Sequence, residues 1–198
     1  MLETKKFGMV SLGCDKNRVD AERLLGILRE KGYCITDDIA EANVLIVNTC
    51  AFLNSARKEA IDTVLDCDAY RNGNLEKIVV TGCLPEKFSA ELFPTLTEAD
   101  VFLGCNDADK LLEAIERSYQ EGRVNMVHSG REWEGQRTLT TPLHYAYLKI
   151  ADGCNNHCTY CLIPKIRGRY RSYPMEKLVA EAERLGELSE LIHVAQDT

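Results

Sequence analysis

The sequence has no long apolar run. Nowhere do about eighteen apolar residues follow one another, which is the length that a membrane-spanning helix needs. It also has no signal peptide, because residues 1–6 lead into a short strand-like run at residues 6–12 rather than into a longer apolar stretch with a cleavage site. We therefore expect a soluble, cytoplasmic protein with no membrane partner.

The chain also lacks an excess of positive charge. The chain carries 24 lysine and arginine residues against 31 aspartate and glutamate residues, a net charge of −7 at pH 7. Proteins that bind duplex nucleic acid neutralise its phosphates with clustered basic side chains. Direct nucleic-acid binding is therefore not expected in this chain, and its acidity suits a basic protein partner better.

Cysteine, in contrast, is abundant, with nine residues in a chain of 198. An odd number of cysteines without a secretion signal is a poor disulfide framework and indicates metal or redox chemistry instead. The apolar content of 45% is enough for an ordinary globular core. The length allows one large domain, or one domain and part of another.

The first part of the chain alternates between strand-like and helix-like segments. Short apolar runs predict strands at residues 6–12, 33–36, 43–49, 77–82 and 101–104. Amphipathic patterns predict helices at residues 17–31, 55–71, 86–93 and 107–121. Strands that alternate with helices indicate an open parallel sheet, so we predict an α/β domain of the flavodoxin-like or Rossmann-like kind at residues 1–121.

The second part of the chain begins after a polar segment. Residues 122–142 are rich in Gly, Arg and Thr and show no sustained period, which predicts a linker. Residues 143–198 then form a truncated second domain that opens with a β-loop-α-β unit. Its predicted elements are a strand at residues 144–150, a loop at 151–173, a helix at 174–188 and a strand at 191–195.

Three cysteines of the second part, Cys154, Cys158 and Cys161, form a C-x3-C-x2-C run. Three thiolates this close in sequence can reach three corners of one cubane iron–sulfur cluster and leave one iron open for a substrate. The alternative is a structural zinc site with His157 as the fourth ligand. Neighbouring His157 and Cys158 point in divergent directions, and zinc sites usually draw their ligands from two separated pairs, so the pattern favours the cluster.

Three cysteines of the first part, Cys14, Cys50 and Cys83, each follow a predicted strand directly. Ligands of open α/β sheets bind at the edge where parallel strands end, so these thiols can converge there. Burial as ordinary core cysteine is the alternative. That alternative explains Cys34, within a strand, and Cys67, on an apolar helix face, better than it explains three strand-end cysteines.

The cysteine run of the second part, with the aromatic Tyr160 before its last cysteine, is similar to the radical S-adenosylmethionine (SAM) signature. The flanking residues 147–153 and 163–172 resemble the methylthiotransferase family of radical SAM enzymes. The resemblance implies that residues 143–198 open a radical SAM partial (β/α) barrel. It also implies that the open iron binds the amino and carboxylate groups of SAM. One electron then cleaves SAM to methionine and a 5′-deoxyadenosyl radical that abstracts hydrogen from an unactivated carbon.

The resemblance extends to the first part of the chain. Residues 11–17 (with Asp20 and Glu22), 48–52 and 81–84 resemble the three N-terminal cysteine motifs of the family. By that resemblance, their cysteines hold an auxiliary [4Fe–4S] cluster that carries or supplies the inserted sulfur. The implied cofactors are therefore two [4Fe–4S] clusters and SAM.

The substrate is also implied by the resemblance. Residues 11–17 are closer to the branch of the family that acts on a ribosomal protein than to the transfer-RNA branch, although Asp15 replaces an expected proline. This implies methylthiolation of the β-carbon of an aspartate in a small-subunit ribosomal protein, with an electron donor such as flavodoxin. Methylthiolation of transfer-RNA adenosine, or an inactive iron–sulfur or zinc-binding fragment, remain the alternatives.

Other side chains near the two cysteine sets are candidates for binding SAM, a cluster or the substrate. Gln196 and Asp197 end the second barrel strand, where radical SAM enzymes commonly contact SAM, and we assign them with Tyr160 to cofactor binding; a polar surface tail is the alternative. The basic residues after the cysteine run could steady a cluster, guide substrate or form a solvated loop; these are Lys165, Arg167, Arg169 and Arg171.

Cys105 also follows a predicted strand. It lies outside the resemblance, and a fourth thiolate would close the cluster, so a structural role is favoured. No side chain is assigned as a catalyst beyond these ligands. Because only the first two strands of the barrel are encoded, we expect the truncated chain alone to be inactive.

Overall fold

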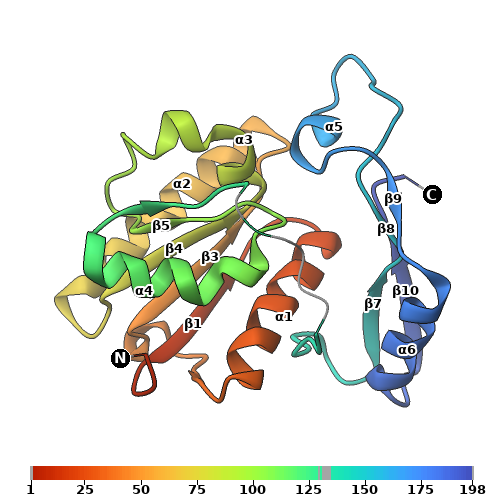
Figure 1. Ribbon diagram of the computed structural model, residues 1–198, viewed down its shortest axis with the longest axis horizontal. Helices are drawn as coiled ribbons and strands as arrows, with labels where there is room; N and C mark the ends of the chain where they lie inside the picture. Colours follow the sequence, from red (N-terminus) through yellow and green to blue (C-terminus); the bar gives the residue numbers. More distant parts are fainter. Residues whose placement is uncertain (1, 129, 131–134, 198) are drawn as a thin grey trace.

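The structure is a computed structural model that describes residues 2–128, 130 and 135–197 (Figure 1). Residues 129 and 131–134 of the predicted linker, and the terminal residues 1 and 198 of the two predicted domains, lie outside the described residues.

The first part of the chain is built on a six-stranded sheet in which all neighbouring strands are parallel. The strand order is β2-β1-β3-β4-β5-β6. The strands are β1 (Lys6–Ser11), β2 (Cys34–Ile35), β3 (Val44–Thr49), β4 (Lys77–Gly82), β5 (Val101–Phe102) and β6 (Val124–Asn125). The predicted α/β class and parallel sheet are therefore confirmed.

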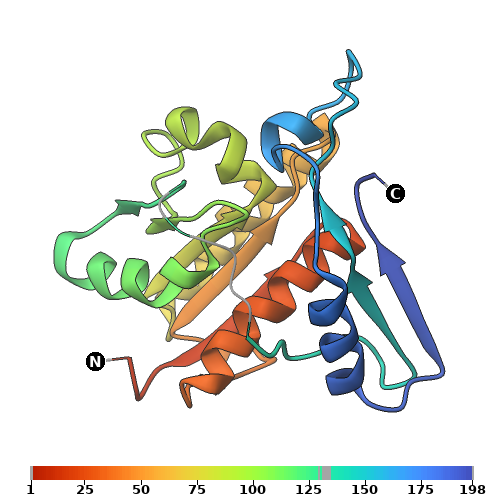
Figure 2. The same ribbon diagram turned by 45° about the vertical axis from the view of Figure 1, so that its right-hand side comes forward.

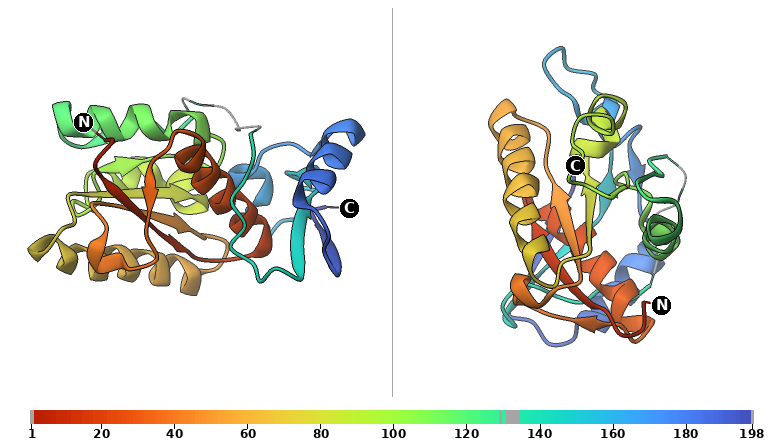
Figure 3. Two further views of the ribbon diagram at one scale, coloured as in Figure 1. Left: turned by 90° about the horizontal axis from the view of Figure 1, so that it is seen from below. Right: turned by 90° about the vertical axis from the view of Figure 1, so that its left-hand side faces the viewer.

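Helices cover both faces of this sheet, as Figure 3 shows. Apolar residues of α1 (Asp15–Glu30) and α4 (Leu111–Glu121) form the core on one face. Residues of α2 (Asn54–Asp68) and α3 (Cys83–Leu92) pack on the other. Because β3 lies between two covered faces, all six of its residues are buried, which explains its continuous apolar run. Short 3-10 helices lie at Ile39–Glu41, Ala69–Asn72 and Ala108–Lys110.

The sheet continues beyond the predicted boundary at residue 121. The last strand, β6, lies inside the segment interpreted as a linker and pairs with β5 through Val101↔Val124 and Phe102↔Asn125. Its two residues are too few to show a strand period in the sequence.

The second part of the chain begins a new sheet, in which β7 (Tyr145–Lys149) pairs in parallel with β10 (Glu190–Val194). The helix α6 (Met175–Leu185) lies between them in sequence and beside them in space (Figure 2). The segment predicted as one long loop contains three short elements. These are β8 (Ala151–Asp152), α5 (Ile163–Ile166) and β9 (Arg171–Ser172), with β8 and β9 antiparallel.

The two parts of the chain meet along α1, which lies between the large sheet and β7 (Figure 1). Within the described residues, no helix combines the length and apolar character required to cross a membrane.

Candidate functional site

The three N-terminal cysteines lie at one edge of the large sheet. Their strands β1, β3 and β4 are adjacent and end in register, with Ser11 opposite Asn48 and Asn48 opposite Thr81. Cys14 caps the start of α1, Cys50 follows β3, and Cys83 is the first residue of α3. The strand order therefore brings together three loops that are far apart in the sequence.

The thiols of this set are close enough to influence one another. Burial raises the pKa of the Cys50 thiol, and the negative charges of Cys83 and Cys14 raise it further. Cys14 is exposed, Cys50 is half-buried and Cys83 is buried, so the set extends from the surface into the sheet edge. We call these three residues the sheet-edge cysteines.

Two glycines allow the chain to turn tightly into this set. Gly13 precedes Cys14 with φ of 97°, and Gly82 precedes Cys83 with φ of 95°. A Cβ atom on Gly13 would lie 2.7 Å from Cys50 Cβ, and one on Gly82 would lie 2.6 Å from Asn48 Oδ1. Both positions therefore need glycine for its conformation and for the close approach of neighbouring loops.

Asn17, in the first turn of α1, forms hydrogen bonds with the chain segments that precede Cys14 and Cys50. Its Nδ2 donates to the carbonyl oxygens of Leu12 at 2.7 Å and Thr49 at 3.2 Å. Asn48 in turn donates from its Nδ2 to the Asn17 carbonyl at 2.7 Å. Asn17 was not predicted to have a role of its own in the site, although a polar residue in the first turn after a cysteine N-cap is a usable signal.

Arg167, the residue that follows α5, reaches this set from the second part of the chain. Its side chain is only 2% exposed. One guanidinium nitrogen, Nη2, donates to Asn17 Oδ1 at 3.0 Å and contacts Cys83 Sγ at 3.4 Å, while Nη1 bonds to the Asp20 carboxylate. The hypothesis of a solvated basic loop is therefore wrong for Arg167, but Lys165, Arg169 and Arg171 are exposed.

Cys105 lies beside the sheet-edge cysteines. Its thiol donates to Cys83 Sγ at 4.0 Å, and this bond, together with the Arg167 guanidinium, lowers the pKa of Cys83 to about 6 against the effect of burial. Of the two cysteines interpreted as ordinary packing residues, Cys67 is buried, whereas Cys34 is exposed on the edge strand β2.

Buried charges continue from Arg167 to the second cysteine set. Lys149 Nζ bonds to Asp20 Oδ1 at 2.8 Å and pairs with Asp152 Oδ2 at 2.6 Å, and Arg167 Nη1 lies 3.6 Å from the same Asp152 oxygen. Burial disfavours the charge on Asp20, but Arg167 and Lys149 outweigh it and hold the pKa of Asp20 well below its usual range. Asp152 stands two residues before Cys154, so the network links both cysteine sets.

The second set lies in the segment between β8 and α5, residues 153–162, which we call the cysteine loop. Cys154 is buried, Cys158 is exposed and Cys161 is half-buried. Backbone N–H groups point at two of the sulfurs: Asn156 N lies 3.4 Å from Cys154 Sγ, and Ile163 N lies 3.5 Å from Cys161 Sγ. Such N–H donors stabilise thiolates and tune iron–sulfur clusters.

The residues predicted to bind SAM lie unevenly around the cysteine loop. Asp197 Oδ2 is 3.5 Å from Cys154 Sγ and accepts a hydrogen bond from Asn156 Nδ2 at 3.0 Å. Gln196 has a buried Oε1 without a hydrogen-bond partner among the described residues. Tyr160, within the cysteine loop, is 82% exposed. Their assignment to SAM stays a prediction.

Both donor sets fit an iron–sulfur cluster in their chemistry. Each offers three thiols, with Arg167 beside one set and backbone N–H groups beside the other. Among the described residues, no three His, Cys, Asp or Glu side chains are arranged as ligands of one metal ion. A cubane cluster binds each thiolate at a different iron and so holds the sulfurs farther apart than a single ion does.

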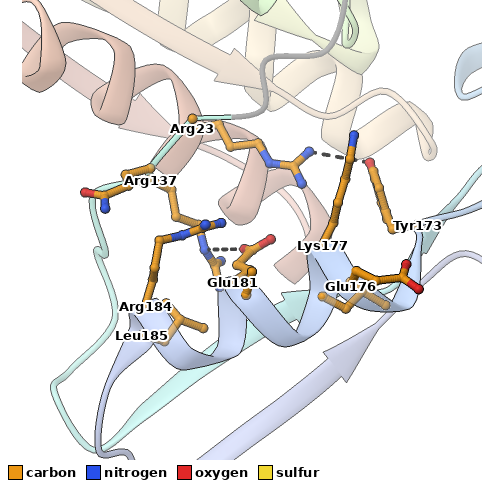
Figure 4. A pocket seen from close by; sticks show the side chains of 12 residues that line it. Arg23, Arg137, Tyr173, Glu176, Lys177, Glu181, Arg184 and Leu185 are labelled. Carbon is orange, nitrogen blue, oxygen red and sulfur yellow. Dashed lines mark hydrogen bonds and ion pairs between the residues drawn. The ribbon is translucent and has the colours of Figure 1, made fainter.

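A cavity of about 370 Å³ lies apart from the cysteines, between α1, the end of the linker and α6 (Figure 4). Side chains that line it are already paired: Arg137 Nε lies 2.9 Å from Glu181 Oε1, and Arg23 Nη1 lies 3.4 Å from the Tyr173 hydroxyl. We interpret this cavity as part of the contact between the two halves of the chain.

The fold and the site define a class: a parallel α/β sheet with cysteines gathered at its strand ends, followed by a C-x3-C-x2-C loop between the first elements of a second sheet. The family described as "Uncharacterized protein family UPF0004" matches residues 6–104, and the radical SAM superfamily matches residues 148–198. The chain therefore belongs to the UPF0004 family, and its match to the radical SAM superfamily covers the C-x3-C-x2-C run that predicted it.

Similar curated proteins carry the name "Ribosomal protein uS12 methylthiotransferase RimO". The one from Clostridium tetani is 50% identical over 98% of this chain and 44% of its own length. Those from Trichlorobacter lovleyi and Thermoanaerobacter sp. are 47% and 44% identical, over 45% and 46% of their lengths. The chain thus spans a little under half the length of these relatives.

Proposed function

We propose that the chain is the N-terminal part of an enzyme that methylthiolates a small-subunit ribosomal protein, with the β-carbon of an aspartate as the acceptor. The observation that carries the proposal is the arrangement of the two cysteine sets, one at the sheet edge and one in the cysteine loop, joined by Arg167. The names of the relatives support the ribosomal protein uS12 as the substrate.

The residues divide into two groups of ligands in this proposal. Cys154, Cys158 and Cys161 would hold one [4Fe–4S] cluster, and the sheet-edge cysteines would hold the other. When bound, one cluster supplies the electron that cleaves SAM and the other supplies or carries the sulfur that is transferred. Because only three cysteines would hold the first cluster, one of its irons would stay available to SAM, as open catalytic metal sites require.

The side chains around these ligands would orient SAM and stabilise the sheet-edge cluster. Asp197, beside Cys154 Sγ, would accept hydrogen bonds from the SAM amino group. Gln196 Oε1, which has no partner among the described residues, would offer a second acceptor. The guanidinium of Arg167 would offset negative charge at the sheet-edge cluster. An electron donor such as flavodoxin would deliver the electron from outside.

An unactivated β-carbon explains why a radical is needed. That carbon is not acidic enough for proton removal by a side chain, so hydrogen abstraction gives access to it. The net charge of −7 suits a basic ribosomal protein rather than a nucleic acid.

The test uses the full-length enzyme, reconstituted with iron and sulfide without oxygen and supplied with SAM and a chemical reductant. We expect mass spectrometry to find a methylthio group on one aspartate of uS12, and none on transfer RNA offered in parallel. Cys161→Ala should abolish both SAM cleavage and product, while Cys34→Ala, at an exposed edge-strand cysteine, should retain them. Modification of transfer RNA instead of uS12 would contradict the proposed substrate.

A further inference from the structure

We infer that Arg167 is a positioning residue shared by both cysteine sites. It fixes the segment after the cysteine loop to the sheet edge and places a positive charge beside the Cys83 sulfur. The inference rests on the proposed function, because it requires that the sheet-edge cysteines hold a cluster.

The first argument is that the Arg167 side chain is buried among several polar partners. The Arg167 side chain is 2% exposed and contacts Asn17, Asp20 and Cys83 from the first part of the chain. It also lies 3.6 Å from Asp152 of the second part. A planar guanidinium can hold several such partners in fixed directions, which the point charge of a lysine cannot.

The second argument is packing around the same position. Ile166, next to Arg167, is 2% exposed and belongs to the apolar cluster that includes Ala51, Cys83 and Leu84. The short helix α5 therefore lies against the loops that carry Cys50 and Cys83. Neighbouring Lys165 and Arg169 are exposed, and Arg171 lies 3.9 Å from the Asp152 carboxylate. Of these basic residues, Arg167 is the one with a contact to a cysteine sulfur within the described part of the chain.

The third argument is electrostatic. One-electron reduction adds a negative charge to a cluster that already carries thiolate charge. A buried positive charge beside one ligand sulfur stabilises the reduced form, because a site with little water screens charges weakly. Removal of the Arg167 charge should therefore lower the reduction potential of the sheet-edge cluster.

The experiment isolates that cluster by replacing Cys154, Cys158 and Cys161 with alanine. The midpoint potential is then measured by optical and electron paramagnetic resonance titration with a reductant. We expect Arg167→Gln to shift the midpoint to a lower potential, so that clearly less than half of the cluster is reduced at the parent's midpoint. Arg167→Lys should give a smaller shift in the same direction, because its ammonium keeps the charge but cannot hold all the partners at once.

Two control variants separate this role from general stability. Arg137 is a buried arginine at the contact between the two parts of the chain. It pairs with Glu22 and Glu181 and bonds to no sulfur among the described residues. Arg137→Gln should therefore lower the thermal midpoint of unfolding and leave the potential unchanged. Arg169→Gln, at an exposed position of the same stretch, should change neither.

The outcomes distinguish the inference from the proposed function. A parent chain that binds no iron through the sheet-edge cysteines would refute both. A parent that loads its cluster, with an Arg167→Gln variant of equal potential, overturns the inference alone, as does an equal shift in Arg137→Gln. If circular dichroism shows that Arg167→Gln does not fold, Arg167→Lys decides, and an unchanged potential in that variant refutes the role.

Discussion

Gly82 sets the direction in which the chain leaves β4 and enters the site. Its φ is 95°, and a Cβ atom there would approach Asn48 Oδ1 and the Thr49 carbonyl oxygen to 2.6 Å. We expect Gly82→Ala to lower the free energy of unfolding by about 2 kcal/mol or more, because strain and steric overlap add. Urea-induced unfolding of the chain measures this loss.

Gly122 provides the matched control for that variant. Its φ of 88° and ψ of −133° are close to the φ of 95° and ψ of −152° of Gly82, but a Cβ atom there meets no atom within 4 Å. Gly122→Ala should therefore cost only the strained backbone conformation itself, about 1 kcal/mol. Equal losses for the two variants would contradict this, because they would show that steric overlap at the sheet edge does not add to the loss of stability.

Asp20 should make the stability of the chain depend on pH. Its folded-state pKa lies below the unfolded value of about 4, because Arg167 and Lys149 favour the carboxylate despite its burial. The stabilisation is therefore present above about pH 4 and is lost as pH falls toward the folded pKa. We expect the free energy of unfolding to fall more steeply below pH 4 in the parent chain than in Asp20→Asn.

The same variant should be less stable at neutral pH. Loss of the carboxylate leaves two buried cations with less compensation, which costs about 3 kcal/mol. An exposed pair is the control: Glu41→Gln breaks the Lys6–Glu41 contact, whose side chains are 44% and 54% exposed, and should cost less than about 1 kcal/mol. A parallel pH dependence in the parent and Asp20→Asn would contradict this role of Asp20.

Among the elements, α1 forms one contact between the two parts of the chain, where it packs against β7, and α3 forms another with α5. Glu22 is fully buried on α1 and binds the end of the linker through Arg137 Nη1 at 2.9 Å and Thr140 N at 2.8 Å. The Glu22 carbonyl also accepts from Thr138 N at 2.9 Å. A buried carboxylate with this set of donors should hold the linker firmly against the helix.

Glu22→Ala should release this segment. We expect the amide hydrogens of Thr138 and Thr140 to exchange faster, because Arg137 loses a buried partner. The free energy of the opening that exposes these amides should fall by about 3 kcal/mol. Hydrogen exchange followed by nuclear magnetic resonance or mass spectrometry measures it. Glu30→Ala, at an exposed position of the same helix, should leave both amides unchanged; unchanged exchange in Glu22→Ala would mean that the linker is held elsewhere.

The sequence predicted the long elements well because apolar patterns identify them. The bounds of β3, β4 and α1 differ from the predictions by two residues or fewer. The short elements β6, β8 and β9 have two residues each and carry no period, so they were missed. The start of α3 at Cys83 was also missed, because its first turn contains Pro85. Proline is tolerated in the first turn of a helix, but it adds no apolar pattern to the sequence.

At the scale of the whole molecule, the sequence predicted the positions of the cysteine sets better than the contact between the two parts of the chain. The rule that ligands bind where parallel strands end was enough to predict that Cys14, Cys50 and Cys83 lie at one edge of the large sheet. The contact that Arg167 makes with Asp20 and Cys83 spans 147 and 84 residues of sequence. No local pattern reports such a pairing, so an arginine in a basic stretch could not be distinguished from its solvated neighbours.

The central claim is that the chain has two separate sites, each of which binds an iron–sulfur cluster through its own three cysteines. The most direct test is the iron and sulfide bound per chain after anaerobic reconstitution, in the parent and in two triple variants. One variant replaces Cys14, Cys50 and Cys83 with alanine, and the other replaces Cys154, Cys158 and Cys161. We predict that each variant loses about half of the parent's iron and that the Cys34→Ala control loses none. A triple variant that keeps all of the iron would contradict the account.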